Sequence, residues 1–401
     1  MSQLNQTLND HLPDTLYFDL QSTNFKSTTT QPGVFKFNET RSNPFCELPD
    51  HYDISILRAT IDTGTVPLFI PSIQPNQGDT NETIYSVTVE GVDSLGATLT
   101  ARTYVSWNPQ DKEAATPLPP NANVTQGAIT GVQDNTTGYY NCYSYSWFLY
   151  LVYVAMGQAL AQLDAAGVVW PTGTLPNTPI ISWDPTRQCA ILQCQLDSFN
   201  VGSQSFVKLY FNAPLFALFN SFPAKYVGYS SSDASEGRNF QIEVVDIGGS
   251  NTSVIFPSGV VGDDNDQYNV INVTQEYSTT ASWSPITAIV FTSNTLPIEP
   301  NQVSTPYIFI NGIPTLGGND ANQENIITDI VSSDGNYRPN LVYYPTAEYR
   351  RIHMYGNRPF HNLDINIHYR LKSGQLIPFR LFSGGVVTLK IGFLKKDKHK
   401  N

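Results

Sequence analysis

The sequence contains one motif that matches a known catalytic turn, Asp62-Thr63-Gly64. Aspartic proteases use such turns because two aspartates share one proton and activate a water molecule between them. This chain has no second Asp-Thr-Gly or Asp-Ser-Gly. A dimeric protease could borrow its second aspartate, and Gly237-Arg238-Asn239 resembles that family's second motif. However, 173 residues separate Gly64 from Gly237, and a charged Glu236 precedes it. We therefore predict that Asp62 is structural and keep an aspartic protease-like protein only as a remote alternative.

The histidines form no metal-binding pattern. His361 and His368 lie seven residues apart, so they fall on opposite faces of the β-strand that we predict over 361–370. Asp364 and His368 share the outward face, where an acid–base pair is geometrically feasible. Because that face should be in water, we interpret the two side chains as a solvent-exposed pair across the pleat.

An acidic run offers oxygen ligands for calcium at Asp263, Asp264 and Asp266, together with Asn265. Its spacing does not match an EF-hand loop, and the closing glutamate is absent. We interpret the run as a solvated acidic turn, with calcium binding as the alternative. The sequence also has no P-loop, no GxGxxG and no GxSxG motif. We therefore predict no catalytic residue, no cofactor and no metal site, which means no enzyme.

The four cysteines are Cys46, Cys142, Cys189 and Cys194, without a CxxC pair. The N-terminus has neither the basic start nor the apolar stretch of a secretory signal, so we expect buried thiols rather than disulfides. The longest apolar run, 145–156, is too short to span a bilayer, and we predict no membrane span.

Charge is scarce and unevenly distributed. Only 14% of residues are charged and the net charge is −12, which argues against a surface that binds nucleic acid throughout. Residues 349–401 carry a net +9 and residues 1–348 a net −21. The basic C-terminal tail is the remaining candidate for weak nucleic-acid contact through phosphates. Its lysines are Lys395, Lys396, Lys398 and Lys400.

The elements that must position these residues are mostly strands. Apolar and polar residues alternate over 361–370 and again over 387–393, and similar β-rich runs recur along the chain. One substantial helix is expected at about 144–166, with Ser144 as N-cap and Gly167 after its end. Many strands with so few helices indicate an all-β fold of antiparallel sandwiches.

The strand count is close to that of two eight-stranded jelly rolls. We therefore predict two jelly-roll β-sandwiches in tandem, with one jelly roll that carries a large insertion as the alternative. The corresponding domains are 1–230, a sandwich with the helix, and 231–401, a second sandwich.

Two regions resemble a known family. The first runs from Gln275 through Trp283-Ser284-Pro285 to Leu296-Pro297-Ile298, and the second from Tyr349-Arg350-Arg351 to Ser383-Gly384-Gly385. Both are similar to jelly-roll capsid proteins of small icosahedral DNA viruses, in particular polinton-like viruses and virophages. The resemblance implies a structural virion protein located in the capsid. With no secretory signal in the sequence of the N-terminus, we expect it to be made in the host cell without a signal peptide. The resemblance also implies that the protein assembles with copies of itself and with other capsid proteins.

The composition agrees with this function independently of the resemblance. Like charges repeated around a symmetry axis repel, so a shell subunit needs wide, mostly uncharged lateral surfaces. A glycan-binding or receptor-binding sandwich, such as a fibre or lectin-like module, is the alternative, because its Tyr, Trp and Asn side chains could hold a sugar.

Overall fold

A computed structural model describes residues 12–24, 33–75, 78–120, 133–229, 235–256, 267–299, 301–302, 307–310, 313–316, 323–331, 340–345 and 350–396. The chain forms two compact units. Unit 1 consists of Met1–Val66, Val124–Ile129 and Pro285–Asn401, and unit 2 of Pro67–Asn123 and Thr130–Ser284. Unit 2 is therefore an insertion into unit 1.

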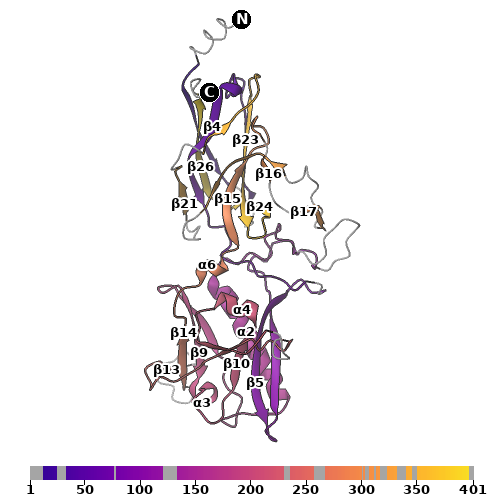
Figure 1. Cartoon of the computed structure of the whole chain (residues 1–401), viewed down its shortest axis with the longest axis vertical. Coiled ribbons are helices and arrows are strands. Elements are labelled where there is room, and N and C mark those ends of the chain that lie inside the picture. Colours follow the sequence, from indigo (N-terminus) through magenta and orange to yellow (C-terminus); the bar gives the residue numbers. More distant parts are fainter. Residues whose placement is uncertain are drawn as a thin grey trace. The chain divides into compact units, whose positions relative to one another are not determined.

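Unit 1 contains two antiparallel sheets (Figure 1). The first has the order β1-β26-β4-β21, with bounds Thr15–Thr23, Val386–Lys395, Tyr52–Asp62 and Asn340–Tyr343, and β22 (Ile352–His353) also pairs with β4. The second has the order β20-β15-β23-β24, with bounds Ile326–Ile330, Ile286–Thr292, Asn362–Leu371 and Leu376–Pro378, and β3 (Lys36–Thr40) also pairs with β23. Short two-stranded pairings complete the unit: β2 (Gly33–Val34) with β25 (Arg380–Leu381), β16 (Asn301–Gln302) with β19 (Gln323–Glu324), and β17 (Tyr307–Ile310) with β18 (Ile313–Leu316).

The pairing in unit 1 is that of a single jelly roll. In chain order its eight main strands are β1, β3, β4, β15, β20, β21, β23 and β26. The first pairs with the last, the second with the seventh, the third with the sixth and the fourth with the fifth. This is the pattern of one long antiparallel hairpin rolled up into a sandwich. Buried Val387, Leu389, Ile391 and Phe393 supply the core from β26, which confirms the alternation read from the sequence.

The strand register fixes where the insertion leaves unit 1. Tyr52, at the start of β4, pairs with Lys395, at the end of β26, and Thr15 pairs with Leu394. Strand β1 thus begins, and strand β26 ends, at the same end of the sandwich. The other end of β4 reaches Asp62, and Ile61 pairs there with Val387. The chain therefore leaves for unit 2 at the end of the sandwich opposite the C-terminal lysines.

Unit 2 has two sheets and the main helix. One sheet has the order β11-β12-β10-β5-β6, with bounds Ala224–Tyr226, Phe240–Ile242, Lys208–Phe211, Glu82–Asp93 and Thr98–Ser106, and β7 (Val168–Val169) also pairs with β5. The other has the order β13-β14-β9-β8, with bounds Thr252–Ile255, Tyr268–Thr274, Cys189–Gln195 and Ile180–Asp184. Short helices are α3 (Leu196–Phe199), α4 (Ala213–Leu218) and α6 (Thr280–Trp283).

Helix α2 (Tyr145–Ala165) forms where the sequence predicted a helix, at about 144–166. It packs against β5, β6 and β8. Its buried residues recur at helical spacing because that face meets the core, and Gly167 has a φ of 85° just beyond its end. By length and composition the helix could cross a membrane, which the shorter apolar run did not indicate. Half of its most apolar stretch is buried, as in the core helix of a globular unit.

The division of the chain differs from the predicted one. The expected boundary at 230/231 falls inside unit 2, where β10 and β12 pair across it. Unit 1 is one jelly roll, and its strands β1, β3 and β4 are separated from the other five by the insertion. The alternative of one jelly roll with a large insertion therefore describes unit 1, and the preferred tandem arrangement does not.

Candidate functional site

The Asp62 side chain accepts a hydrogen bond from the backbone of its own turn. The Gly64 N–H donates to Asp62 Oδ1 at 3.0 Å, and the Thr65 hydroxyl donates to the Arg380 carbonyl oxygen. Asp62 ends β4 in unit 1, whereas Gly237-Arg238-Asn239 lies in unit 2. The carboxylate thus holds an Asx turn at the point where the chain leaves the jelly roll.

Asp364 is buried, with 3% of its surface exposed, so the prediction of a solvent-exposed pair with His368 is wrong. The turn after β15 folds over this side chain. Asp364 Oδ1 accepts from Ser293 Oγ at 2.7 Å, from the Asn294 N–H at 2.9 Å, and from the N–H and Oγ1 of Thr295 at 3.0 and 2.8 Å. Asp364 Oδ2 accepts from Asn294 Nδ2 at 3.1 Å and from Asn366 Nδ2 at 3.2 Å.

Burial alone would raise the pKa of Asp364, but the hydrogen bonds from Ser293, Thr295 and Asn294 outweigh it and lower the pKa. The carboxylate therefore stays ionised and ties β23 to the end of β15. His368 Nδ1 lies 3.4 Å from Thr292 Oγ1, and burial lowers the pKa of His368. These contacts give both residues positions in the sandwich core rather than an acid–base role.

No group of three or more His, Cys, Asp or Glu side chains that could hold a metal ion occurs among the described residues. The Asp263, Asp264 and Asp266 run lies outside them.

The four cysteines are buried free thiols, as expected. Burial raises the pKa of Cys46 to about 11 and also raises that of Cys194, so both stay protonated and unreactive at neutral pH.

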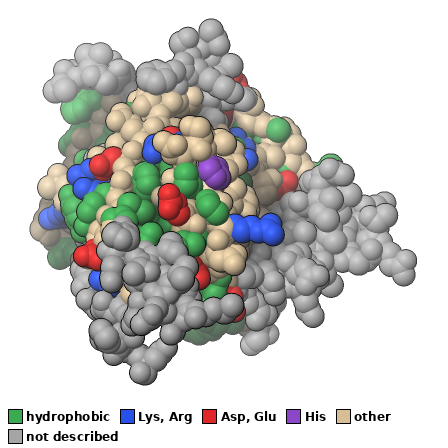
Figure 2. Space-filling model, turned by 90° about the horizontal axis from the view of Figure 1, so that it is seen from above, with side chains coloured by type: hydrophobic (Ala, Val, Ile, Leu, Met, Phe, Trp, Pro, Cys, Tyr) green, Lys and Arg blue, Asp and Glu red, His purple; other side chains and the backbone are tan. Residues whose placement is uncertain are grey.

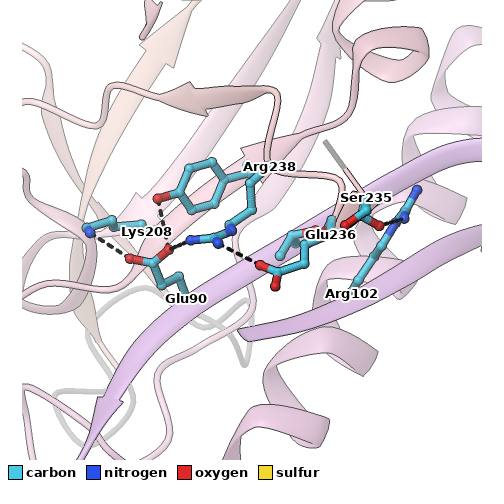
Figure 3. Close-up of polar contacts among 8 residues, drawn as sticks. Glu90, Arg102, Lys208, Ser235, Glu236 and Arg238 are labelled. Atoms are coloured by element: carbon cyan, nitrogen blue, oxygen red, sulfur yellow. Dashed lines mark hydrogen bonds and ion pairs between the residues drawn. The ribbon is translucent and has the colours of Figure 1, made fainter. Parts of the chain in front are cut away.

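Among the described residues, the most extensive charged network lies in unit 2, and the sequence did not predict it (Figure 3). Glu90 on β5 is 5% exposed and accepts from Lys208 Nζ at 2.6 Å, Arg238 Nη1 at 2.7 Å and Tyr210 Oη at 3.1 Å. Burial raises the Glu90 pKa, but the Lys208 and Arg238 bonds outweigh it and lower the pKa. Its oxygens are taken up by donors of its own chain, and the lowered pKa leaves it no proton to donate at neutral pH and makes it a weaker base. The one sequence signal for it was a single Glu in a strand otherwise free of charge between Glu82 and Asp93.

The network fastens segment 235–239 across the sheet. Arg102 Nη1 donates to the Ser235 carbonyl at 2.6 Å, and Thr88 Oγ1 donates to the Glu236 carbonyl at 2.7 Å. Gly237 has a φ of 77°, and a Cβ there would lie 2.8 Å from Arg102 Nε. Glycine is therefore required both by the backbone conformation and by the close approach of the sheet. Gly237-Arg238-Asn239 therefore serves to hold segment 235–239 on the sheet, and the structure gives it no protease-like function.

The described tail lysines contact the jelly roll itself. Lys395 Nζ donates to the Leu12 carbonyl at 3.2 Å. Lys396 Nζ donates to the carbonyls of Asp50 at 3.0 Å and Met354 at 2.9 Å. Both ammonium groups thus bind backbone carbonyl groups at the end of the sandwich where β26 ends. Lys398 and Lys400 lie outside the described residues.

The two units differ in charge. Unit 2 has 6 Lys/Arg against 18 Asp/Glu, a net −12, and unit 1 has 16 of each. The positive C-terminal segment is therefore balanced within unit 1, and the acidity of the chain belongs to the insertion.

Figure 2 shows hydrophobic side chains gathered in the middle of the face seen from above, with single charged side chains scattered among neutral ones. Such a surface suits contact with other protein chains better than binding of a polyanion over its whole area.

Comparison with known proteins identifies a family. The family model described as Sputnik minor capsid protein V18/19 matches residues 16–395. The uncharacterized protein V18 of Sputnik virophage is 31% identical over 156 residues, which are 38% of this chain and 86% of V18. The structural protein V19 of Sputnik virophage is 24% identical over 202 residues, which are 48% of this chain and 84% of V19.

Two solved structures share the fold. A chain in the cryo-EM structure of the Sputnik virophage has a TM-score of 0.74 and 24% identity, and the match covers 97% of this chain and all of that one. The crystal structure of the mavirus penton protein has a TM-score of 0.56 and 13% identity, and the match covers 96% of this chain and all of that one. These likenesses extend over both units.

Proposed function

We propose that this chain, which belongs to the family of Sputnik minor capsid proteins V18/19, forms pentamers at the fivefold vertices of an icosahedral virophage-type shell. The family membership makes the chain a structural capsid protein of a virion. The vertex position and the pentamer are the parts that we propose.

The observation that carries the proposal is the single jelly roll in unit 1, interrupted by one large insertion. The mavirus penton protein shares this fold over nearly the whole chain. Head-to-tail contacts between identical copies form a closed ring when the rotation from one copy to the next closes on itself. The low charge of the chain supports such contacts, because few like charges meet around the axis.

We further propose that the end of the sandwich with the C-terminal tail faces the interior of the particle. This proposal is supported by the strand register, in which the insertion and the C-terminal tail leave unit 1 at opposite ends. Because Lys395 and Lys396 bind carbonyl groups of their own chain, weak contact with packaged nucleic acid would depend on Lys398 and Lys400. Deletion of residues 397–401 should keep the sandwich folded and reduce the salt dependence of DNA binding.

We assign the chain no catalytic function. The support is that the buried carboxylates Glu90 and Asp364 are saturated by hydrogen-bond donors and that Asp62 is used in a turn. The purified parent chain should cleave no peptide substrate. Cleavage that Asp62→Asn abolishes would instead support the protease alternative.

Native mass spectrometry of the purified full chain tests the oligomeric state. The expected result is a species with five times the mass of the 44.4 kDa chain that dissociates on dilution. A chain that stays monomeric at every concentration that can be reached would contradict the proposal.

A further inference from the structure

The histidines of this chain are distributed unevenly. All six lie in unit 1, and unit 2 has none. Four of them are among the described residues, and three of these four, His51, His353 and His361, lie at the end of the sandwich where β26 ends. The fourth, His368, lies within β23. We name this end of unit 1 the tail end, and it consists of residues 12–14, 39–53, 297–299, 351–361 and 395–396.

Two of the three histidines are held beside aspartates. Strand β22 pairs with β4 so that His353 is opposite Asp53, and His353 Nδ1 lies 2.5 Å from Asp53 Oδ1. The side chain of His353 is 66% exposed. His51 ends the short helical turn that precedes β4, and its Nε2 lies 3.7 Å from Asp50 Oδ1. The Lys396 N–H donates to the His51 carbonyl at 2.9 Å, which places this histidine beside the end of β26.

His361 belongs to the same end through an aromatic contact. Its Nδ1 lies 3.1 Å from the Arg41 carbonyl oxygen, and the residue is exposed. Phe360, which precedes it, stacks on Phe45 with ring centroids 5.9 Å apart. Phe360 also contacts the ring of Phe393, close to the end of β26, at 5.8 Å. The three imidazoles therefore lie at one end of unit 1.

The other charged side chains at the tail end nearly cancel. Five are basic: Arg41, Arg351, Arg358, Lys395 and Lys396. Six are acidic: Asp14, Glu39, Glu47, Asp50, Asp53 and Glu299. The formal net charge of the tail end is therefore −1 when the three imidazoles are neutral and +2 when all three are protonated.

Mild acid therefore reverses the sign of the charge at the tail end. Imidazole is the side chain whose ordinary pKa places its change of charge between pH 5 and 8. Carboxylate, ammonium and guanidinium groups ordinarily keep their charge over this range, as phosphodiesters do. Unit 2, which has no histidine, keeps its net −12. The tail end alone changes from a surface that repels a polyanion to one that attracts it.

We propose that the tail end binds the phosphates of packaged nucleic acid in mild acid and releases them near neutral pH, with His51, His353 and His361 supplying the added charge. The inference rests on the proposed function, because it assumes that the tail end faces the interior of the particle. The acidic insertion of another copy is the competing polyanion. Nucleic acid fits better, because the insertion leaves unit 1 at the end opposite the tail end.

The test measures binding of the full-length chain to a short labelled DNA duplex by fluorescence anisotropy. At about 0.1 M salt, the parent should bind at least about tenfold more tightly at pH 5.5 than at pH 7.5. The slope of log K against log salt should be steeper by about 2 to 3 in acid, because three more phosphates are neutralised. The combined variant His51→Gln, His353→Gln and His361→Gln should lose most of this difference.

His368→Gln is the matched control. This residue lies away from the tail end and burial lowers its pKa, so the variant should keep the tenfold difference. Deletion of residues 397–401 should also keep it, because the three histidines remain.

A second combined variant tests the charge directly. With His51→Arg, His353→Arg and His361→Arg, the chain should bind DNA at pH 7.5 as tightly as the parent does at pH 5.5. Circular dichroism at both pH values shows whether each variant is folded.

Three results would overturn the inference. They are a parent that binds DNA equally at both pH values, a glutamine variant that keeps the full difference, and association of copies without DNA that strengthens in acid through the same histidines. The last would identify the acidic insertion as the partner. The proposed pentamer is judged separately, by native mass spectrometry of the parent without DNA at neutral pH.

Discussion

Replacement of Asp364 by Asn should destabilise the jelly roll while leaving the insertion folded. The variant keeps the shape of the side chain, but its amide nitrogen replaces the Oδ2 that accepts from Asn294 Nδ2 and Asn366 Nδ2. These two side-chain donors, together with the Asn294 N–H that also lies 3.1 Å from Oδ2, then face another donor. The bonds that remain at Oδ1 lose their ionised acceptor. At about 1 to 1.5 kcal/mol for each bond lost, with a further contribution from the lost charge, we expect a decrease in stability of about 2–4 kcal/mol.

The tryptophans allow the two units to be followed separately. All five, Trp107, Trp147, Trp170, Trp183 and Trp283, belong to unit 2. In urea, the Asp364→Asn variant should lose β-sheet circular dichroism at lower denaturant than the parent, and its tryptophan fluorescence transition should move less. Asp19→Asn is the control, because Asp19 is exposed in the same unit, and it should change stability by no more than about 0.5 kcal/mol.

The pH dependence of the difference follows from the pKa of Asp364, which is lowered on folding from its ordinary value of 3.8. A carboxylate with a lowered pKa stabilises the folded state fully above its unfolded pKa, and this contribution is lost as the pH falls through the folded pKa. The gap between parent and variant should therefore persist at neutral pH and shrink only below about pH 4. A gap of less than about 1 kcal/mol at pH 7 would refute the structural function that we assign to Asp364.

Three further predictions concern unit 2 and the thiols. Glu90→Gln should lower the stability reported by tryptophan fluorescence by about 2–4 kcal/mol, because Arg238 keeps its charge in a half-buried position without this partner. An unchanged urea midpoint would contradict it. Gly237→Ala should destabilise unit 2 by at least about 1 kcal/mol more than Gly96→Ala. Both glycines have a φ near 80°, but only at Gly237 does a Cβ meet the sheet, so equal losses would show that the close approach does not matter. In the folded chain none of the four cysteines should react with a thiol reagent at pH 8, and all four should react in denaturant. Rapid labelling of the native protein would disprove their burial.

The local elements were predictable from the sequence because their signals are local. The alternation over 361–370 and the helical spacing before Gly167 each lie within a single segment, and both elements form as expected. The domain division was not predictable in this way. The pairing of Thr15–Thr23 with Val386–Lys395 joins segments more than 360 residues apart, and neither segment carries a sign of its partner.

The same distinction explains the errors at single residues. Alternation placed Asp364 on the outer face of its strand, but a turn from another part of the chain, 293–295, covers that position. The partners of Glu90 come from 208, 210 and 238, which only the folded sheet brings together. Periodicity reports which side of a strand a residue is on, and it does not report what lies above that side.

The central claim, that this capsid protein forms the fivefold vertices, is tested most directly by cryo-EM of particles assembled with the chain. The account predicts density at each fivefold vertex for five copies of the jelly roll formed by residues 15–62 and 286–395, each interrupted by its insertion. Vertices built from a different protein, with this chain elsewhere in the shell or absent from it, would contradict it.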